Sequence, residues 1–299
     1  IIKRFIMNVL ITGSNGQLGR ELAKNLANGY TELGPIPEEL QGAQVVCVDV
    51  DEMDITNYDA VVDLVEELSL DVIFNCAAYT NVNGCETDSD AAFRVNALGA
   101  RNLAMAAERF GAKPIHVSTD YVFSGEGNTP RSEWDLCDPQ SVYGKTKYLG
   151  EQYVRDFCKR YFIVRTAWLY GYEGNNFVKT IMRIAREKGS ATVVNDQFGN
   201  PTNAADLAHH LLKLAVTEQY GLYHCTGTGE CSWYDFACKI VEYAGIPATV
   251  SPCTTAEYPT PAKRPAYSSL DNRMLRNTVG DEMRPWEEAL RYFITHLEG

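Results

Sequence analysis

Short apolar runs alternate with longer segments of helical periodicity through the first 165 residues, and this alternation constrains the fold more than any other feature. The runs at 8–12, 44–50, 70–75, 114–118 and 161–165 have the length and apolar character of buried parallel strands. Helical patterns separate them, at 20–28, 57–67, 88–110 and 140–160. Strict alternation of this kind predicts an α/β protein with a doubly wound parallel sheet.

The loop after the first run carries three glycines between a predicted strand and a predicted helix. Glycine allows a tight turn and a close approach of the backbone, while free N–H groups at a helix start attract a pyrophosphate. A purely structural turn is the alternative. We interpret the loop as the dinucleotide site of a Rossmann-like sheet, formed by Gly13, Asn15, Gly16, Gln17, Leu18 and Gly19.

An acidic residue follows the second run in the place where such folds bind the adenosine ribose. Asp49 can accept hydrogen bonds from ribose hydroxyls and repels a 2′-phosphate, which favours NADH over NADPH. Asp54 and Ile55 are expected to flank the adenine, although Asp54 can equally be a helix cap. Small residues after the third run suit close contact with ribose and nicotinamide, and there we expect Ala77, Ala78 and Tyr79.

A hydroxyl, a phenol and an ammonium are predicted to meet near the end of the fourth run. Tyr143 and Lys147 lie four positions apart in a helical segment and share one face. A positive charge about 4 Å from a phenol, at an effective dielectric of about 20, favours the phenolate by roughly 4 kcal/mol before desolvation opposes it. With Thr119 at the strand end, we interpret them as a carbonyl-reducing centre. Alone, Tyr-x-x-x-Lys is more often ordinary helix surface.

The pattern changes after residue 165. We expect helices to about 187 and at 204–216, 232–245 and around 286–297, with strands at 191–195 and 221–225. This predicts an NAD(P)-binding domain over 7–167 and a smaller α/β substrate-binding domain over 168–299, with about 191–230 returning to the first. Trp168 is interpreted as a substrate contact or as core packing, and Arg264 as a diphosphate ligand or as part of a solvated loop.

Charge and cysteine usage restrict the partners. A net charge of −12 and a pI near 4.9 argue against nucleic-acid or anionic-membrane binding. The nine cysteines show neither Cys-x-x-Cys pairs nor Cys/His zinc spacing, so we expect reduced thiols, no metal site and a cytoplasmic protein. Residues 1–6 are too short for a signal peptide or a membrane span.

Several separated motifs together resemble one family. The glycine loop, Asn96, Thr119 and the Tyr143/Lys147 pair occur in the order found in extended short-chain dehydrogenases/reductases. The segments 118–123, 165–171, 196–202 and 264–271, read as STDYVF, RTAWLYG, DQFGNPT and RPAYSSLD, narrow the resemblance to the dTDP-4-dehydrorhamnose reductase family.

The resemblance implies reduction of dTDP-4-dehydrorhamnose at C4 to dTDP-L-rhamnose with NADH or NADPH. Tyr143 would donate the proton, Thr119 would bind the carbonyl oxygen, Lys147 would bind the nicotinamide ribose and lower the pKa of Tyr143, and Asn96 would support a proton-relay water. The implied substrate contacts are Thr80, Val82, Thr119, Asp120, Tyr121, Trp168, Asn175 and Arg264. A monomer or homodimer is expected.

The chain departs from the family pattern at 83–86, Asn203 and Ala205; the last makes a magnesium-bridged dimer doubtful. Two other functions remain open. A nucleotide-sugar 4-epimerase or another 4-ketoreductase would use the same centre, whereas a 4,6-dehydratase would need a Glu where Tyr121 stands. A non-catalytic homologue, similar to the regulatory subunit of methionine adenosyltransferase, would not need Thr119, Tyr143 and Lys147.

Overall fold

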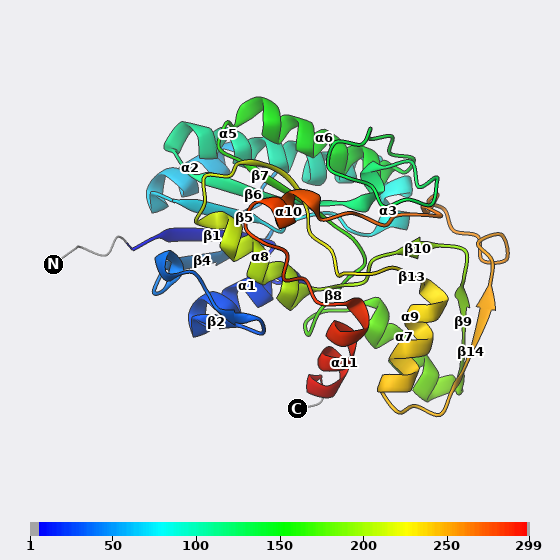
Figure 1. Cartoon of the computed structure of the whole chain (residues 1–299). Helices are drawn as coiled ribbons and strands as arrows, with labels where there is room; N and C mark the ends of the chain where they lie inside the picture. Colours follow the sequence, from blue (N-terminus) through cyan, green and yellow to red (C-terminus); the bar gives the residue numbers. More distant parts are fainter. Residues whose placement is uncertain (1–5, 298–299) are drawn as a thin grey trace.

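The computed structural model describes residues 6–297, so most of the segment 1–6 considered above lies outside it. A six-stranded parallel sheet forms its centre (Figure 1). In spatial order the strands are β12 (Gly221–His224), β7 (Phe162–Thr166), β6 (Lys113–Thr119), β5 (Val72–Asn75), β1 (Asn8–Thr12) and β4 (Gln44–Val48). The predicted doubly wound α/β fold is thereby confirmed.

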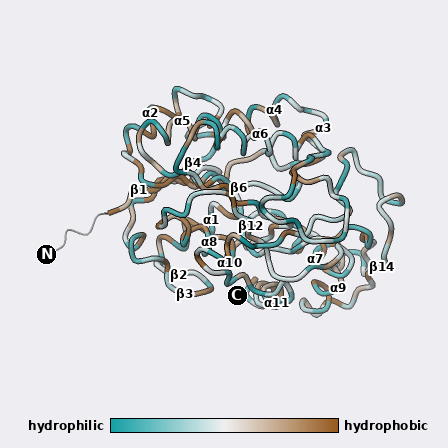
Figure 2. Tube along the Cα trace, turned by 45° about the horizontal axis from the view of Figure 1, so that its top comes forward, coloured by the Kyte–Doolittle hydropathy of each residue, from teal (hydrophilic) through white to brown (hydrophobic). Residues whose placement is uncertain are grey.

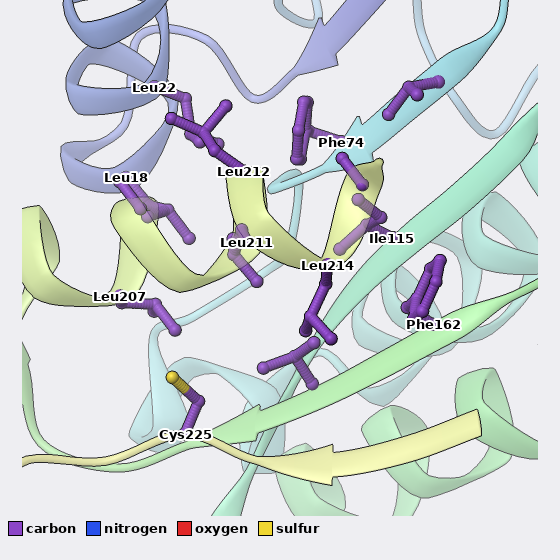
Figure 3. Close-up of a cluster of buried hydrophobic side chains, with 14 of the residues drawn as sticks. Leu18, Leu22, Phe74, Ile115, Phe162, Leu207, Leu211, Leu212, Leu214 and Cys225 are labelled. Carbon is purple, nitrogen blue, oxygen red and sulfur yellow. The ribbon is translucent and has the colours of Figure 1, made fainter. Parts of the chain in front are cut away.

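Helices cover both faces of this sheet. One face carries α1 (Gln17–Asn28) and α8 (Ala204–Ala215), and the other carries α2 (Tyr58–Leu68), α5 (Ala100–Phe110) and α6 (Val142–Phe157) (Figure 1). Figure 3 shows the leucines of α1 and α8 gathered against side chains of the sheet. The trace in Figure 2 is brown along β1, while the outer helices alternate between brown and teal, as amphipathic helices on a buried sheet require.

The segment 88–110 is not the single helix that its periodicity predicts. It consists of α4 (Ser89–Phe93), a π-helical turn η2 (Arg94–Gly99) and α5. The π-helical turn brings the backbone carbonyl of Asn96 against Gly150 of α6, where a Cβ atom would collide with it. Hydrophobic spacing reports which face is buried, but it does not report a local change from i→i+4 to i→i+5 hydrogen bonds.

A separate hydrophobic core in the carboxyl-terminal part of the chain contains residues of three helices. These are α7 (Phe177–Lys188), α9 (Trp233–Tyr243) and α11 (Trp286–His296). The helices α7 and α9 lie beside a parallel pair of strands, β9 (Ser190–Val194) and β14 (Thr249–Cys253), and α11 packs against α9 (Figure 1). In the segment 191–230, α8 and β12 belong to the central sheet, but β9 pairs with β14.

Shorter elements complete the chain. The predicted loop 30–42 contains a small hairpin, β2 (Tyr30–Thr31) and β3 (Gly34–Pro35), and a 3₁₀ turn, η1 (Glu38–Leu40). The others are α3 (Val82–Thr87), η3 (Asp120–Val122), β8 (Leu169–Tyr170), β10 (Phe198–Gly199), β11 (Thr202–Asn203), β13 (Cys231–Ser232) and α10 (Arg273–Asn277). Within residues 6–297, no helix has both the length and the apolar character needed to cross a bilayer.

Candidate active site

A cavity of about 820 Å³ lies at the carboxyl ends of the central strands. The chain runs from β1 to β4 on one side and then returns to β5 on the other, and doubly wound sheets bind ligands at such a reversal. The starts of α7 and α9 close the opposite side. The predicted site residues in its lining are Gly13, Gly16, Gln17, Leu18, Gly19, Asp49, Asp54, Ile55, Ala77, Ala78, Tyr79, Thr80, Val82, Thr119, Asp120, Tyr121, Tyr143, Lys147, Trp168 and Asn175.

The glycine loop fits the phosphates of a dinucleotide. Gly13 has a φ of 64°, and a Cβ atom there would lie 2.6 Å from the backbone nitrogen of Ala77. The N-cap of α1, Gly16, provides no side-chain hydrogen bond, and the first turn contains no acidic residue. The amides of this turn therefore face the cavity without a competing side chain and at the positive end of the helix dipole.

Asp49 lies in the turn just after β4, beside the glycine loop. Its carboxylate accepts hydrogen bonds from the backbone N–H of Asn15 at 3.0 Å and of Val50 at 2.8 Å. Asn15 contributes this backbone contact and does not itself line the cavity. The carboxylate thus fixes the turn after β4 against the glycine loop, at the wall of the cavity.

The two hydroxyl groups of the predicted centre lie together. Thr119, at the end of β6, is 5% exposed and donates a hydrogen bond to Asp120 at 2.9 Å. Burial raises the pKa of Tyr143 above its usual value, and a hydrogen bond with Thr119 opposes this rise. In the free protein desolvation outweighs any lowering of this pKa by Lys147, so the net shift is upward. A raised pKa keeps the phenol protonated near neutral pH, as a proton donor requires.

Lys147 is 2% exposed, and its ammonium donates a hydrogen bond to the backbone carbonyl of Val117 at 2.7 Å. Burial lowers its pKa to about 8, while the nearby carboxylate of Glu151 opposes this change. Glu151 forms a buried ion pair with Arg165, in which Arg165 Nη2 lies 2.6 Å from Glu151 Oε2. Lys147 therefore carries its charge at neutral pH, at the boundary between the sheet and the cavity.

The side chain of Asn96 forms three hydrogen bonds with other parts of the protein. Its side-chain oxygen accepts a hydrogen bond from the backbone N–H of Tyr79 at 2.8 Å, and its amide nitrogen donates to the Tyr79 carbonyl and to Thr146, both at 3.2 Å. The side chain does not line the cavity. It instead holds in place the segment after β5 that forms the cavity floor.

Arg264 lies outside the lining but reaches it through one neighbour. Its guanidinium donates a hydrogen bond to the hydroxyl of Tyr121 at 3.3 Å. The Tyr121 ring lies 5.4 Å from the ring of Tyr143 in an edge-to-face arrangement. Burial raises the pKa of Tyr121 to about 12, and the charge of Arg264 opposes this rise. Asp120 is 3% exposed, and burial raises its pKa to about 6.

An aromatic cluster, which no sequence pattern indicates, lines the predicted substrate half of the cavity. Trp168 has a φ of 47°, which large side chains rarely adopt, and its ring stacks on Trp233. Phe177 and Phe236 complete the cluster. Phe177 and Trp233 are the first residues of α7 and α9, after the N-caps Asn176 and Ser232. Asn and Ser are recognisable as N-cap residues in a sequence, but the sequence does not show that these two helices begin at the same cavity.

The comparisons with known proteins agree with this geometry. The family described as RmlD substrate binding domain matches residues 7–298. The chain is 40% identical to a dTDP-4-dehydrorhamnose reductase of Aggregatibacter actinomycetemcomitans, over 97% of this chain and 99% of that protein. A solved dTDP-4-dehydrorhamnose reductase from Clostridium acetobutylicum is 47% identical with a TM-score of 0.92, covering 98% of this chain and 100% of that one.

A further solved structure is informative about the cofactor. It is a dTDP-4-dehydrorhamnose reductase from Bacillus anthracis in complex with NADP, 43% identical with a TM-score of 0.90, and it covers 97% of this chain and 99% of that one. Both the sequence and the fold are therefore shared over nearly the whole length. The chain belongs to the dTDP-4-dehydrorhamnose reductase family of extended short-chain dehydrogenases/reductases.

Proposed function

We propose that the protein reduces the C4 ketone of dTDP-4-dehydrorhamnose to give dTDP-L-rhamnose, with NADH or NADPH as the reductant. The observation that carries this proposal is the convergence of Thr119, Tyr143 and Lys147 in one cavity that also contains a phosphate-binding glycine loop. A bound nicotinamide cofactor supplies the hydride. The remaining tasks, which are to hold the sugar, bind its oxygen and provide a proton, belong to side chains of this chain.

Tyr143 and Thr119 are placed to act on the ketone oxygen. The protonated phenol of Tyr143 gives its proton to that oxygen as negative charge develops there. Thr119 provides a second hydroxyl beside it, which stabilises the same charge. Lys147, held by the Val117 carbonyl, binds the nicotinamide ribose and supplies a positive charge behind the phenol. Asp120, Tyr121 and Trp168 border the sugar, together with Thr80, Val82 and Asn175.

The substrate can be tested directly against its rivals. Purified protein is mixed with NADPH and, in separate reactions, with dTDP-4-dehydrorhamnose and other 4-keto nucleotide-sugars, and cofactor oxidation is followed by absorbance. We expect the highest kcat/KM for dTDP-4-dehydrorhamnose, with one cofactor consumed for each sugar reduced. A 4-epimerase would interconvert sugars without net cofactor oxidation, and a non-catalytic homologue would oxidise no cofactor with any sugar.

The cofactor preference follows from Asp49. We predict that NADH serves at least as well as NADPH, because the carboxylate lies at the adenosine end of the cavity and repels a 2′-phosphate. Replacing it in Asp49→Asn should move the ratio of kcat/KM values toward NADPH by roughly tenfold. The ratio is measured with both cofactors at a saturating sugar concentration. A wild-type preference of tenfold for NADPH would mean that Asp49 does not face the ribose.

The pH dependence follows from Lys147. Its folded-state pKa of about 8 lies below the usual value for lysine, so the ammonium is charged below that pH and loses its proton as the pH rises through it. We predict that kcat/KM of the free enzyme falls on the alkaline side near pH 8. Arginine keeps its charge, so the residual activity of Lys147→Arg should show this fall at a higher pH. An unchanged alkaline limb in that variant would assign the limb to another group.

Two further expectations form part of the proposal. A cytoplasmic location is supported by the nine cysteines, all of which lie within the described residues and are free thiols. The protein is proposed to act as a monomer or homodimer. Ala205 is 1% exposed in α8 and offers no carboxylate, which disfavours a metal bridge through that position.

A further inference from the structure

Two tryptophans that are far apart in the sequence stack within the substrate half of the cavity. The ring centroids of Trp168 and Trp233 are 3.5 Å apart, and their planes differ by 7°. Both indoles line the cavity and both are half-buried. Phe177 packs against Trp233 with a centroid distance of 4.4 Å. The two indoles and this phenyl ring form a continuous aromatic surface, which we name the indole stack.

Trp168 requires support from its surroundings. Its left-handed φ of 47° is unfavourable for a large side chain, so the conformation persists only where neighbouring groups hold it. The backbone is held by a hydrogen bond from the Thr202 N–H to the Trp168 carbonyl at 3.2 Å. The ring has space only because residue 199 is glycine: a Cβ atom there would lie 2.6 Å from Cε2 of the indole. Trp233 provides the stacked face.

The position of Trp233 is fixed by the capped start of α9. It is the first residue of α9, and its N-cap Ser232 forms a reciprocal capping box with Asp235, in which the Asp235 N–H donates to Ser232 Oγ at 3.0 Å. The carboxylate of Asp235 in turn accepts the Ser232 N–H at 3.1 Å. Trp168, by contrast, follows β7 of the central sheet. The indole stack therefore joins the end of the central sheet to the start of α9 at the cavity.

We propose that Trp233 is a positioning residue for substrate binding, which holds the indole of Trp168 as a fixed apolar wall against which the sugar ring of the nucleotide-sugar packs. The inference rests on the proposed function for the identity of the sugar. It goes beyond that function because Trp233 acts through Trp168 and not on the reacting atoms. Apolar and aromatic walls with few polar groups are how pockets of this size orient a ligand.

The test measures binding of dTDP-L-rhamnose and turnover in variants of residue 233. Trp233→Leu removes the flat ring but keeps an apolar side chain, and we expect it to raise the dissociation constant of dTDP-L-rhamnose and the KM of the sugar substrate by roughly tenfold, near the upper limit for an aromatic pair. The kcat should change less than threefold, and NADPH affinity should not change. Trp233→Phe keeps a stacking ring, so its KM should stay within about twofold of wild type.

A spectroscopic signature separates positioning from general packing. Two stacked indoles give an exciton couplet in far-ultraviolet circular dichroism, which should disappear in Trp233→Leu and in Trp233→Phe. Trp134 is 62% exposed and does not line the cavity, so Trp134→Leu is the matched control and should keep both the couplet and the KM. If Trp233→Leu loses the couplet but binds dTDP-L-rhamnose like wild type, the proposal is wrong.

The other outcomes are equally decisive. Equal KM values for the Leu and Phe variants would show that stacking does not position the sugar, and would overturn the inference. If the wild-type protein neither reduces the keto-sugar nor binds dTDP-L-rhamnose, the proposed function itself fails, and the inference falls with it. These results are distinguishable because the first is seen in a comparison of variants and the second in the wild-type protein.

Discussion

Replacing Tyr143 by phenylalanine should lower kcat by roughly 10²–10⁴-fold, which is the range for the loss of a general acid. Burial raises the pKa of the Tyr143 phenol, so the phenol is protonated and can donate to a ketone oxygen beside Thr119. Phenylalanine keeps the ring and its edge-to-face contact with Tyr121, so only the hydroxyl is lost. Steady-state kinetics with dTDP-4-dehydrorhamnose and NADPH give the loss.

The control for this variant lies on the same helix. Tyr148 is half-buried in α6 but does not line the cavity, so Tyr148→Phe should keep kcat near the wild-type value. Both variants should bind NADPH with wild-type affinity and unfold at similar temperatures. A Tyr143→Phe protein that retains more than half of the wild-type kcat would remove Tyr143 from the role of proton donor.

Replacing Arg264 by alanine should raise the KM for the nucleotide-sugar by roughly 10- to 100-fold, equivalent to about 1.5–3 kcal/mol for a hydrogen bond to a charged group. A protein with a net charge of −12 repels a dianionic substrate, so binding depends on a few local cations. Arg264 is half-buried and donates to the hydroxyl of Tyr121, which places its guanidinium at the edge of the substrate half of the cavity. Its forked donors suit a diphosphate.

Variants of the same loop separate charge from geometry. Arg264→Lys should recover only part of the affinity, because an ammonium cannot provide two parallel donors. Lys263 is the exposed neighbour of Arg264, and Lys263→Ala should change the KM by less than threefold. If Arg264→Ala keeps its KM for the sugar and instead weakens NADPH binding, Arg264 belongs to the cofactor side.

The sheet and the cofactor loop could be predicted because their signals are local. The apolar residues 9–11, followed at once by a glycine loop, are typical of a strand in a covered parallel sheet. Glycines at 13 and 19 are needed because the backbone there leaves no room for a Cβ atom. Thr119, Tyr143 and Lys147 were found by their spacing along a strand end and a helix. The structure places all three in one cavity.

Other features depend on the environment of a side chain, which spacing does not report. Four positions on a helix bring Tyr143 and Lys147 to one face, but burial raises the pKa of the tyrosine and directs the lysine to the Val117 carbonyl. The sequence also did not indicate that the side chain of Asn96 would hold the backbone of Tyr79. Trp233 was missed because it reaches the cavity from a helix 65 positions after Trp168.

The transfer of deuterium from labelled NADPH to the sugar tests the central claim most directly. The protein is incubated with dTDP-4-dehydrorhamnose and NADPH that carries deuterium at the transferable position, and the product is analysed by NMR and mass spectrometry. The account predicts dTDP-L-rhamnose with one deuterium at C4, formed in step with cofactor oxidation, and no such product from Tyr143→Phe on the same timescale. A product without deuterium at C4, or labelled at another carbon, would contradict the claim that this cavity reduces the C4 ketone.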